Sequence, residues 1–323
     1  MKNLTYKEIK ELSVGYVRAS EDSLGLHFYK CTERQVEFWR EVDPIFEGRA
    51  NATTGVRIDF YTNSKTVKFA LSKGKFEVYV DNLLRNQYIV GGEEYPEDKE
   101  ITLDVCTPLG EELENARITI YFPSHAHGYI KSLSVDEDAY VKPYEYDGKM
   151  LLLGDSITQG FNSEFDSFSF AHQLSRALNK EPLIQAIGGI TFREESIEPL
   201  MLDADLVIIA LGTNDYTVLP TYEDLRGAVS PYFDKISKIY GGRKIFVISP
   251  IWRAKTGRPM GSFAECRNII IEEADKRGFI HIDGLSLVPP IPSLFADEWL
   301  HPNALGFGFY GENLIRIMLE KLK

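Results

Sequence analysis

The sequence predicts an α/β chain of two domains, an antiparallel β-sandwich followed by a parallel sheet between helices. The chain has 323 residues, more than one compact core usually holds. Segments up to about residue 141 alternate apolar with polar residues, whereas later ones are short, continuously apolar runs separated by helical stretches. The pattern changes near residues 146–148, so we expect domains at residues 1–145 and 146–323.

Segments of the N-terminal half repeat with the period of a strand that has one face in water. They are clearest at residues 56–61, 67–71, 76–80 and 117–122. Strands of this kind bury their apolar faces against one another, which predicts a β-sandwich of jelly-roll character. Between residues 15 and 141 we expect no helix of any length.

The C-terminal half contains apolar runs typical of strands buried on both faces. They lie at residues 150–153, 183–187, 206–211, 245–248 and 279–282. Apolar residues recur at helical spacing between them, most clearly within residues 222–239. Such strands alternating with helices predict a parallel sheet covered on both faces, and ligands bind such sheets beyond the carboxyl ends of the strands.

Charge and cysteine content narrow the class of protein. The net charge of −12 argues against nucleic acids and anionic membranes as partners. No apolar run is long enough for a signal peptide or a membrane span. The three cysteines, Cys31, Cys106 and Cys266, are odd in number and far apart, unlike a disulfide framework. We therefore expect a cytoplasmic protein, with its oligomeric state left open.

Small and polar residues follow the first three predicted strands of the C-terminal half. Ser156 stands where a strand gives way to a helix, so its hydroxyl is exposed and the first helical amides can face an oxyanion. Ser or Asp in this place also commonly caps the helix. Gly188 and Gly189 either make a tight turn or let a backbone N–H approach a substrate. Asn214 offers a side-chain amide, or serves as a turn residue.

The segment around His301 supplies a base. A serine hydroxyl is a weak nucleophile until a base takes its proton, and histidine has the pKa for that task. An acid close to the histidine can hold its tautomer and stabilise the imidazolium, and both Asp297 and Glu298 lie within a few residues. Taken alone, a single histidine in a loop is more often a surface residue.

Four segments follow one another along the chain, around Ser156, Gly189, Asn214 and His301. In this order they resemble the GDSL/SGNH hydrolase superfamily, and the resemblance extends from about residue 150 to the end of the chain. The resemblance implies a flavodoxin-like hydrolase domain and a serine esterase that needs no metal or organic cofactor. It implies that Ser156 is the nucleophile and also an oxyanion-hole donor through its own amide. Gly189 and Asn214 take the places of the other donors, and His301 takes that of the general base.

The acid departs from the pattern of this superfamily. An Asp normally stands three residues before the histidine, whereas here that position holds Glu298, and Asp297 lies one residue further back. We prefer Glu298 because it keeps the spacing, and geometry decides a catalytic triad more than residue identity. Asp297 is the alternative, and a Ser–His dyad oriented by backbone carbonyls is the third possibility.

The two-domain arrangement resembles the acetyl esterases of carbohydrate esterase family 2. The resemblance implies removal of short acyl groups, above all acetyl, from esters of oligosaccharides or of small molecules. This implication rests on the shared architecture alone. Trp252 and Arg253 follow the fourth strand and Trp299 lies near the histidine, so these are candidate substrate-binding residues. The alternatives are a lipase or thioesterase acting on non-sugar esters, and a carbohydrate-binding protein whose hydrolase site has decayed.

Overall fold

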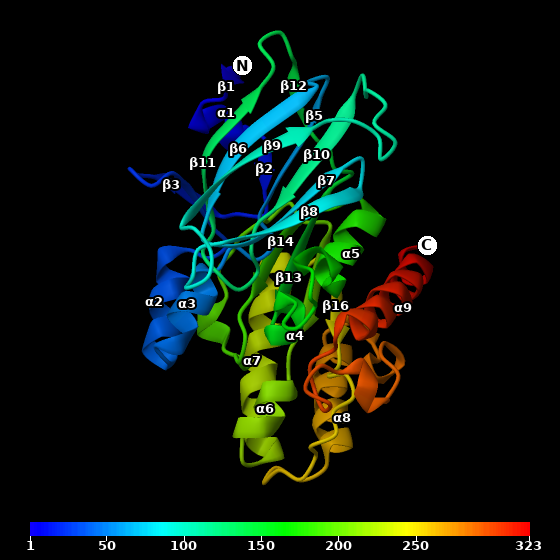
Figure 1. The fold of residues 1–323 in the computed structure, drawn as a ribbon. Coiled ribbons are helices and arrows are strands. Elements are labelled where there is room, and N and C mark those ends of the chain that lie inside the picture. The colour runs from blue at the N-terminus through cyan, green and yellow to red at the C-terminus, as the bar shows by residue number, and fades with distance from the viewer. The chain divides into compact units, whose positions relative to one another are not determined.

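The computed structural model describes residues 1–323, which fall into two compact units (Figure 1). The first unit comprises residues 1–32 and 51–146, and the second comprises residues 33–50 and 147–323. The expected boundary after residue 145 lies one residue before the last passage between the units, at residues 146 and 147. The two contiguous domains that we expected nevertheless differ from the two units, because residues 33–50 group with the C-terminal part of the chain.

The first unit consists of two antiparallel sheets with an apolar core between them. One sheet has the order β3-β4-β11-β6-β9, with β1 paired to β11, and the other has the order β12-β5-β10-β7-β8, with β2 paired to β5. Inward side chains such as Phe60 and Ile118 are fully buried. The predicted β-sandwich is confirmed.

The strands and the helix of this unit have the following bounds. The first sheet contains β1 (Lys2–Asn3), β3 (Arg18–Glu21), β4 (Leu26–Tyr29), β6 (Thr66–Ser72), β9 (Asp98–Asp104) and β11 (Tyr129–Val135). The second sheet contains β2 (Ser13–Val14), β5 (Arg57–Thr62), β7 (Gly74–Val80), β8 (Leu83–Val90), β10 (Ala116–Tyr121) and β12 (Val141–Pro143). Helix α1 (Tyr6–Glu11) lies between β1 and β2 in the chain.

The second unit is built on a five-stranded parallel sheet of order β14-β13-β15-β16-β17. Numbered along the chain this order is 2-1-3-4-5, the flavodoxin-like order, so the predicted fold class is confirmed. The strands are β13 (Lys149–Gly154), β14 (Glu181–Ala186), β15 (Leu206–Ala210), β16 (Lys244–Ile248) and β17 (Ile280–Ile282).

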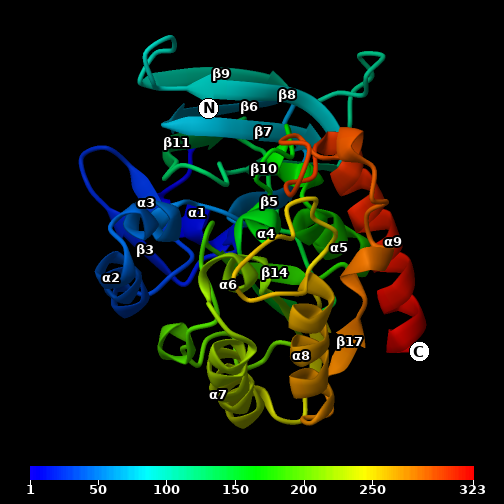
Figure 2. The same cartoon turned by 90° about the horizontal axis from the view of Figure 1, so that it is seen from below.

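Helices cover both faces of this sheet. Met150 and Leu152 of β13 share one buried cluster with Leu174 of α5 and Leu314 of α9, and Figure 2 shows α7 and α8 together on the other side. The α-helices after β13 are α4 (Ser156–Gln159), α5 (Phe170–Leu178), α6 (Thr213–Val218), α7 (Tyr222–Tyr240), α8 (Phe263–Asp275) and α9 (Ala304–Leu322). Short 3₁₀ turns occupy Asp166–Phe168, Glu194–Ser196, Gly284–Ser286 and Pro292–Leu294. No helix combines the length and the apolar composition that crossing a bilayer requires.

A helical hairpin, α2 (Glu33–Val42) and α3 (Ile45–Asn51), contradicts the expectation that no helix lies between residues 15 and 141 (blue in Figure 1). Trp39 is 3% exposed, and its ring packs edge-on against Phe46, with the ring centroids 5.8 Å apart. The two helices are only ten and seven residues long. Such short helices depend on packing rather than on propensity, and for that reason the periodic pattern missed them.

Polar contacts join this hairpin to the rest of the second unit. The buried side chain of Gln35 donates to Gln185 of the edge strand β14 at 3.1 Å and to the carbonyl of Ser196 at 2.9 Å. Arg34 forms a salt bridge with Glu198. Residues 33–50 are therefore a structural part of the unit that carries the parallel sheet.

Two buried carboxyl groups lie just beyond the ends of β13 and β15. Asp155 accepts a hydrogen bond from the amide of Ile157 at 2.9 Å, and Asp215 accepts one from the amide of Phe192 at 3.0 Å. Burial raises the pKa of each carboxyl to about 7. The nearby Asp155 contributes to the raised pKa of Asp215, since two like charges in one buried region repel each other.

This burial predicts how stability changes with pH. The pKa of Asp155 is raised from 3.8 to about 7, so the folded chain holds this proton more tightly than the unfolded chain, and its contribution to stability is lost as the pH rises through that range. Asp155→Asn keeps an oxygen for the amide of Ile157 and does not titrate. Between pH 4.5 and 7.5 the variant should gain about 1–3 kcal/mol in free energy of unfolding relative to wild type, measured by urea denaturation.

Asp275→Asn is the matched control for this experiment, because that side chain is exposed. Its free energy of unfolding should follow the wild-type pH curve. A constant difference between Asp155→Asn and wild type across the range would contradict the raised pKa.

Candidate active site

Ser156 begins α4 at the carboxyl end of β13, where the strand turns directly into a helix. Asp155 has an extended backbone and caps the helix through its contact with the amide of Ile157. A Cβ on Gly154 would lie 2.0 Å from the hydroxyl oxygen of Thr158, so only glycine fits there. Because Asp155 is the cap, the half-buried Ser156 hydroxyl is available for other contacts.

The side chains of Ser156, His301 and Asp297 form a continuous line. Ser156 Oγ lies 2.9 Å from His301 Nε2, and His301 Nδ1 lies 2.7 Å from Asp297 Oδ2. With Nδ1–H donating to the carboxylate, the lone pair of Nε2 faces the hydroxyl, which is the tautomer that a general base requires. The structure thus brings together residues that are 145 positions apart in the chain.

Asp297 holds both the imidazole and the turn that carries it. Its Oδ1 accepts hydrogen bonds from the backbone amides of Trp299, Leu300 and His301, at 3.1, 2.8 and 3.1 Å. Burial acts to raise the pKa of Asp297, but the hydrogen bonds from the His301 ring and from these amides outweigh it and hold the pKa below its ordinary value. The carboxylate therefore stays ionised opposite the ring at neutral pH.

The structure does not place Glu298, the acid that we preferred, in contact with His301. The Glu298 side chain is exposed, and its backbone φ of +63° is left-handed, an uncommon conformation for a residue with a side chain. The amide of Ala296 donates to the carbonyl of His301 at 2.8 Å and closes the loop. The turn at Glu298 takes up the additional residue, so the carboxylate four positions before the histidine, Asp297, reaches the ring.

The glycine pair after β14 forms a tight turn over residues 187–190. Gly189 has φ of +91°, as the third position of a type II turn requires, and this conformation favours glycine. The amide of Gly188 donates to the side-chain oxygen of Gln159 at 2.8 Å. A Cβ on Gly188 would lie 3.4 Å from the Cβ of Ser156, so the turn lies directly beside the candidate nucleophile.

Asn214 lies in the first turn of α6, and the same glycine turn orients its side chain. Its amide nitrogen donates to the carbonyl of Ile190 at 2.9 Å, which uses one of its two N–H groups. Gly212 precedes the helix with φ of +116°, and a Cβ there would lie 2.4 Å from Ile270 Cδ1. The hydrogen bond between Asn214 and Ile190 therefore links the glycine and asparagine segments.

Arg253 follows β16, as expected, but its side chain contacts the start of α6. The side chain is 2% exposed, and its Nη1 donates to the carbonyl of Thr213 at 2.7 Å and to the hydroxyls of Thr213 and Thr217 at 3.1 and 3.0 Å. Its guanidinium is used to hold the start of α6, which carries Asn214. The expected contact between Arg253 and substrate is therefore not supported.

Trp252 and Trp299 are half-buried. The ring of Trp252 packs against Phe295 with centroids 4.8 Å apart, and Lys255 Nζ lies 4.3 Å from the ring centroid of Trp299. Both tryptophans also pack against the apolar core of the unit, so their exposed parts alone are available to a substrate.

Phe161 is an aromatic residue of the site that sequence reasoning missed. Its side chain is 45% exposed, and its ring meets the His301 imidazole edge-on, with the ring centroids 4.9 Å apart. It follows Gly160, which ends α4 in a left-handed conformation. The available signal was its position five residues after Ser156, directly behind the short helix.

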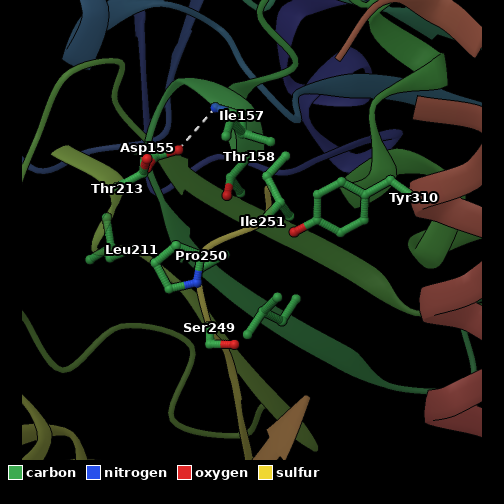
Figure 3. A pocket seen from close by; sticks show the side chains of 11 residues that line it. Asp155, Ile157, Thr158, Leu211, Thr213, Ser249, Pro250, Ile251 and Tyr310 are labelled. Atoms are coloured by element: carbon green, nitrogen blue, oxygen red, sulfur yellow. Dashed lines mark hydrogen bonds between the residues drawn. The ribbon is translucent and has the colours of Figure 1, made fainter. Parts of the chain in front are cut away.

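A cavity of about 20 Å³ lies behind the serine loop (Figure 3). Its lining includes Asp155, Thr158, Ser249 and Tyr310, and the Thr158 hydroxyl is buried there without a protein partner. This volume has room for one water molecule. Neither Ser156 nor His301 is among the residues that line this cavity.

Comparisons with known structures support the same fold. A salicylyl-acyltransferase from a tetracycline biosynthetic pathway has a TM-score of 0.77 at 17% identity, covering 96% of this chain and 94% of that one. An acetyl xylan esterase from the rumen bacterium Butyrivibrio proteoclasticus has a TM-score of 0.66 at 13% identity, covering 99% and 98%. An active-site mutant of a family two carbohydrate esterase from Clostridium thermocellum has a TM-score of 0.62 at 18% identity, covering 83% and 92%. At these identities the likeness speaks for the fold.

Sequence comparison identifies the family of the part of the chain that contains the candidate site. A search of curated proteins gave no match. A family model, that of the GDSL-like lipase/acylhydrolase family, matches residues 152–308, which span the loops of Ser156, Gly189, Asn214 and His301. The chain therefore contains a GDSL-like lipase/acylhydrolase domain, and the match includes all four of these loops.

Proposed function

We propose that the chain is a serine esterase that removes short acyl groups, above all acetyl, from hydroxyl groups of oligosaccharides. The observation that carries this proposal is the line of contacts from Ser156 through His301 to Asp297, at 2.9 and 2.7 Å. A hydroxyl, a correctly oriented imidazole and an ionised carboxylate are the groups that acyl transfer through a covalent serine ester requires.

The proposed reaction has two stages. Ser156 Oγ attacks the ester carbonyl carbon while His301 Nε2 accepts the hydroxyl proton, and the carbonyl oxygen becomes an oxyanion. The C–O bond to the sugar then breaks, and the sugar hydroxyl leaves with the proton from His301. Water attacks the acyl-serine in the same way, with His301 again as the base, and releases the carboxylic acid. Asp297 stabilises the imidazolium in both stages.

The oxyanion would be held by preorganised N–H groups. We assign this role to the amides of Ser156 and Gly189 and to the side chain of Asn214, which the Ile190 carbonyl orients. Donors fixed in this way lose no energy to reorientation during the reaction, and each is worth about 3–4 kcal/mol of barrier.

Support for the sugar substrate comes from the fold. An acetyl xylan esterase and a family two carbohydrate esterase share it. Phe161 places an exposed ring beside the imidazole, and aromatic faces are a common support for sugar rings. A cytoplasmic location belongs to the same proposal, because the three cysteines are few and far apart in the sequence, unlike a disulfide framework.

Substrate class can be tested directly. The purified chain should release acetate from acetylated xylose or mannose oligomers faster than it turns over 4-nitrophenyl palmitate or acyl-CoA. Ser156→Ala should lower kcat by at least about 10⁴-fold, because the residual oxyanion donors cannot replace the nucleophile. Faster turnover of the long-chain ester or the thioester would reject the sugar assignment in favour of a lipase or thioesterase.

The identity of the acid can be tested with two adjacent variants. Asp297→Asn should lower kcat/KM by about 10²–10⁴-fold, because the amide no longer selects the required tautomer of His301. Glu298→Gln is the matched control and should stay within about threefold of wild type, since its side chain is exposed. Equal losses of kcat/KM in the two variants, measured on 4-nitrophenyl acetate, would contradict the role of Asp297 as the acid of the triad.

Covalent labelling separates an esterase from a carbohydrate-binding protein with a decayed site. A fluorophosphonate should label wild type on Ser156 and leave Ser156→Ala unlabelled, since labelling needs an activated hydroxyl. Peptide mass spectrometry locates the adduct. Glycan binding by a wild-type chain that resists the label would establish the binding protein instead.

A further inference from the structure

Helix α3 places Arg49 beside the glycine turn of the candidate active site. Arg49 Nη1 donates to the carbonyl oxygen of Gly188 at 2.6 Å. A Cβ on Gly188 would lie 3.4 Å from the Cβ of Ser156 and 3.7 Å from Cδ of Arg49. Arginine, glycine and candidate nucleophile are thus immediate neighbours, although Arg49 lies more than 100 residues before the other two in the chain.

The carbonyl that Arg49 holds belongs to the same peptide group as the amide of Gly189. A peptide group is planar, and in its trans form the C=O and N–H bonds point in opposite directions. Fixing the Gly188 oxygen on the side of Arg49 therefore fixes the N–H of Gly189 on the opposite side. That N–H is one of the donors that we assign to the oxyanion.

This peptide needs an external contact to keep its orientation. Type I and type II turns differ mainly in the direction of the central peptide group, and two glycines without Cβ atoms oppose a flip only weakly. The hydrogen bond from Gly188 N to Gln159 holds the preceding peptide group, between residues 187 and 188. The hydrogen bond from Arg49 holds the next peptide group, between Gly188 and Gly189.

The surroundings of Arg49 keep it in place. Phe46 lies one turn earlier on α3, and a Cβ on Gly189 would lie 3.0 Å from its ring and 2.9 Å from Arg49 Nη1. Both side chains are half-buried. A positive guanidinium on a carbonyl also polarises the peptide group, which strengthens its N–H as a hydrogen-bond donor.

We propose that Arg49 is a positioning residue of the oxyanion hole, acting through the peptide group between Gly188 and Gly189. The hairpin α2–α3, encoded within the sandwich half of the sequence, thereby completes the hydrolase site. The inference rests on the proposed esterase function, and it concerns the rate of the acyl-transfer step rather than the choice of substrate.

Steady-state kinetics on 4-nitrophenyl acetate test the proposal. Arg49→Ala should lower kcat by about 10- to 100-fold, less than the about 10²–10³-fold loss that follows deletion of a donor itself. KM should change by less than about threefold, because the interaction matters in the transition state. Arg49→Lys, which keeps one charged donor but lacks the planar fork, should lie between Arg49→Ala and wild type.

Arg34→Ala is the matched control. Arg34 lies on the same hairpin and anchors it to Glu198, away from the glycine turn. If Arg49 only helped the hairpin to dock, both variants would lose activity together. We expect Arg34→Ala to keep kcat within about twofold of wild type, with the unfolding midpoint of each variant recorded to check folding.

Chemical rescue distinguishes positioning from packing. Millimolar guanidinium should restore part of the kcat of Arg49→Ala and leave that of Arg34→Ala unchanged. An unchanged kcat in Arg49→Ala, an equal loss in Arg34→Ala, or a rise in KM alone would overturn the proposal.

A wild-type chain that turns over no ester would count against the proposed function, and the positioning role can still be measured then. Phosphonylation of Ser156 places an oxygen among the same donors, so its rate reports on the oxyanion hole without turnover. If the donors are intact but misplaced, the labelling rate of Arg49→Ala should be at least about 10-fold lower than that of Arg34→Ala. Equal labelling rates would overturn the positioning role.

Discussion

The candidate site depends on one carboxylate, that of Asp297. Its two oxygens have different tasks: Oδ1 gathers three consecutive backbone amides, and Oδ2 takes the imidazole N–H. The same side chain therefore shapes the turn and orients the ring that the turn carries. Asp297 thereby couples the direction of the His301 ring to the turn that contains the left-handed backbone of Glu298. Burial opposes this arrangement and the hydrogen bonds overcome it, which is visible in the lowered pKa of Asp297.

The parallel sheet explains how such distant segments meet. Because all five strands run the same way, their carboxyl ends share one edge, and the loops of Ser156, Gly189 and Asn214 leave from adjacent strands. This much could be predicted from the sequence: the runs at residues 150–153 and 206–211 correspond to Lys149–Gly154 and Leu206–Ala210. Strands buried on both faces need continuous apolar stretches, so each of them can be recognised from a short segment of the sequence.

What could not be predicted depends on contacts between distant residues. The choice between Asp297 and Glu298 depends on the shape of the turn before His301, which includes a left-handed backbone at Glu298 and which spacing does not reveal. Arg253 follows a strand end as a substrate-binding residue would, yet its side chain is 2% exposed and its Nη1 donates to Thr213 and Thr217. A motif places a residue at the correct edge of the sheet, and the packing around it then decides whether its polar atoms face solvent or neighbouring backbone.

The hairpin α2–α3 extends this reasoning from side chains to whole elements. Its helices are short, and they are held by the buried ring of Trp39 and by the buried amide pair of Gln35 and Gln185. A glycine turn lets backbone approach a substrate closely because it lacks side chains, and for the same reason it has little rigidity of its own. Preorganised donors are effective only when they do not move, so the flexibility that glycine brings to the site has to be removed by a contact from elsewhere. Arg49, on a helix far away in sequence, is placed to supply that contact.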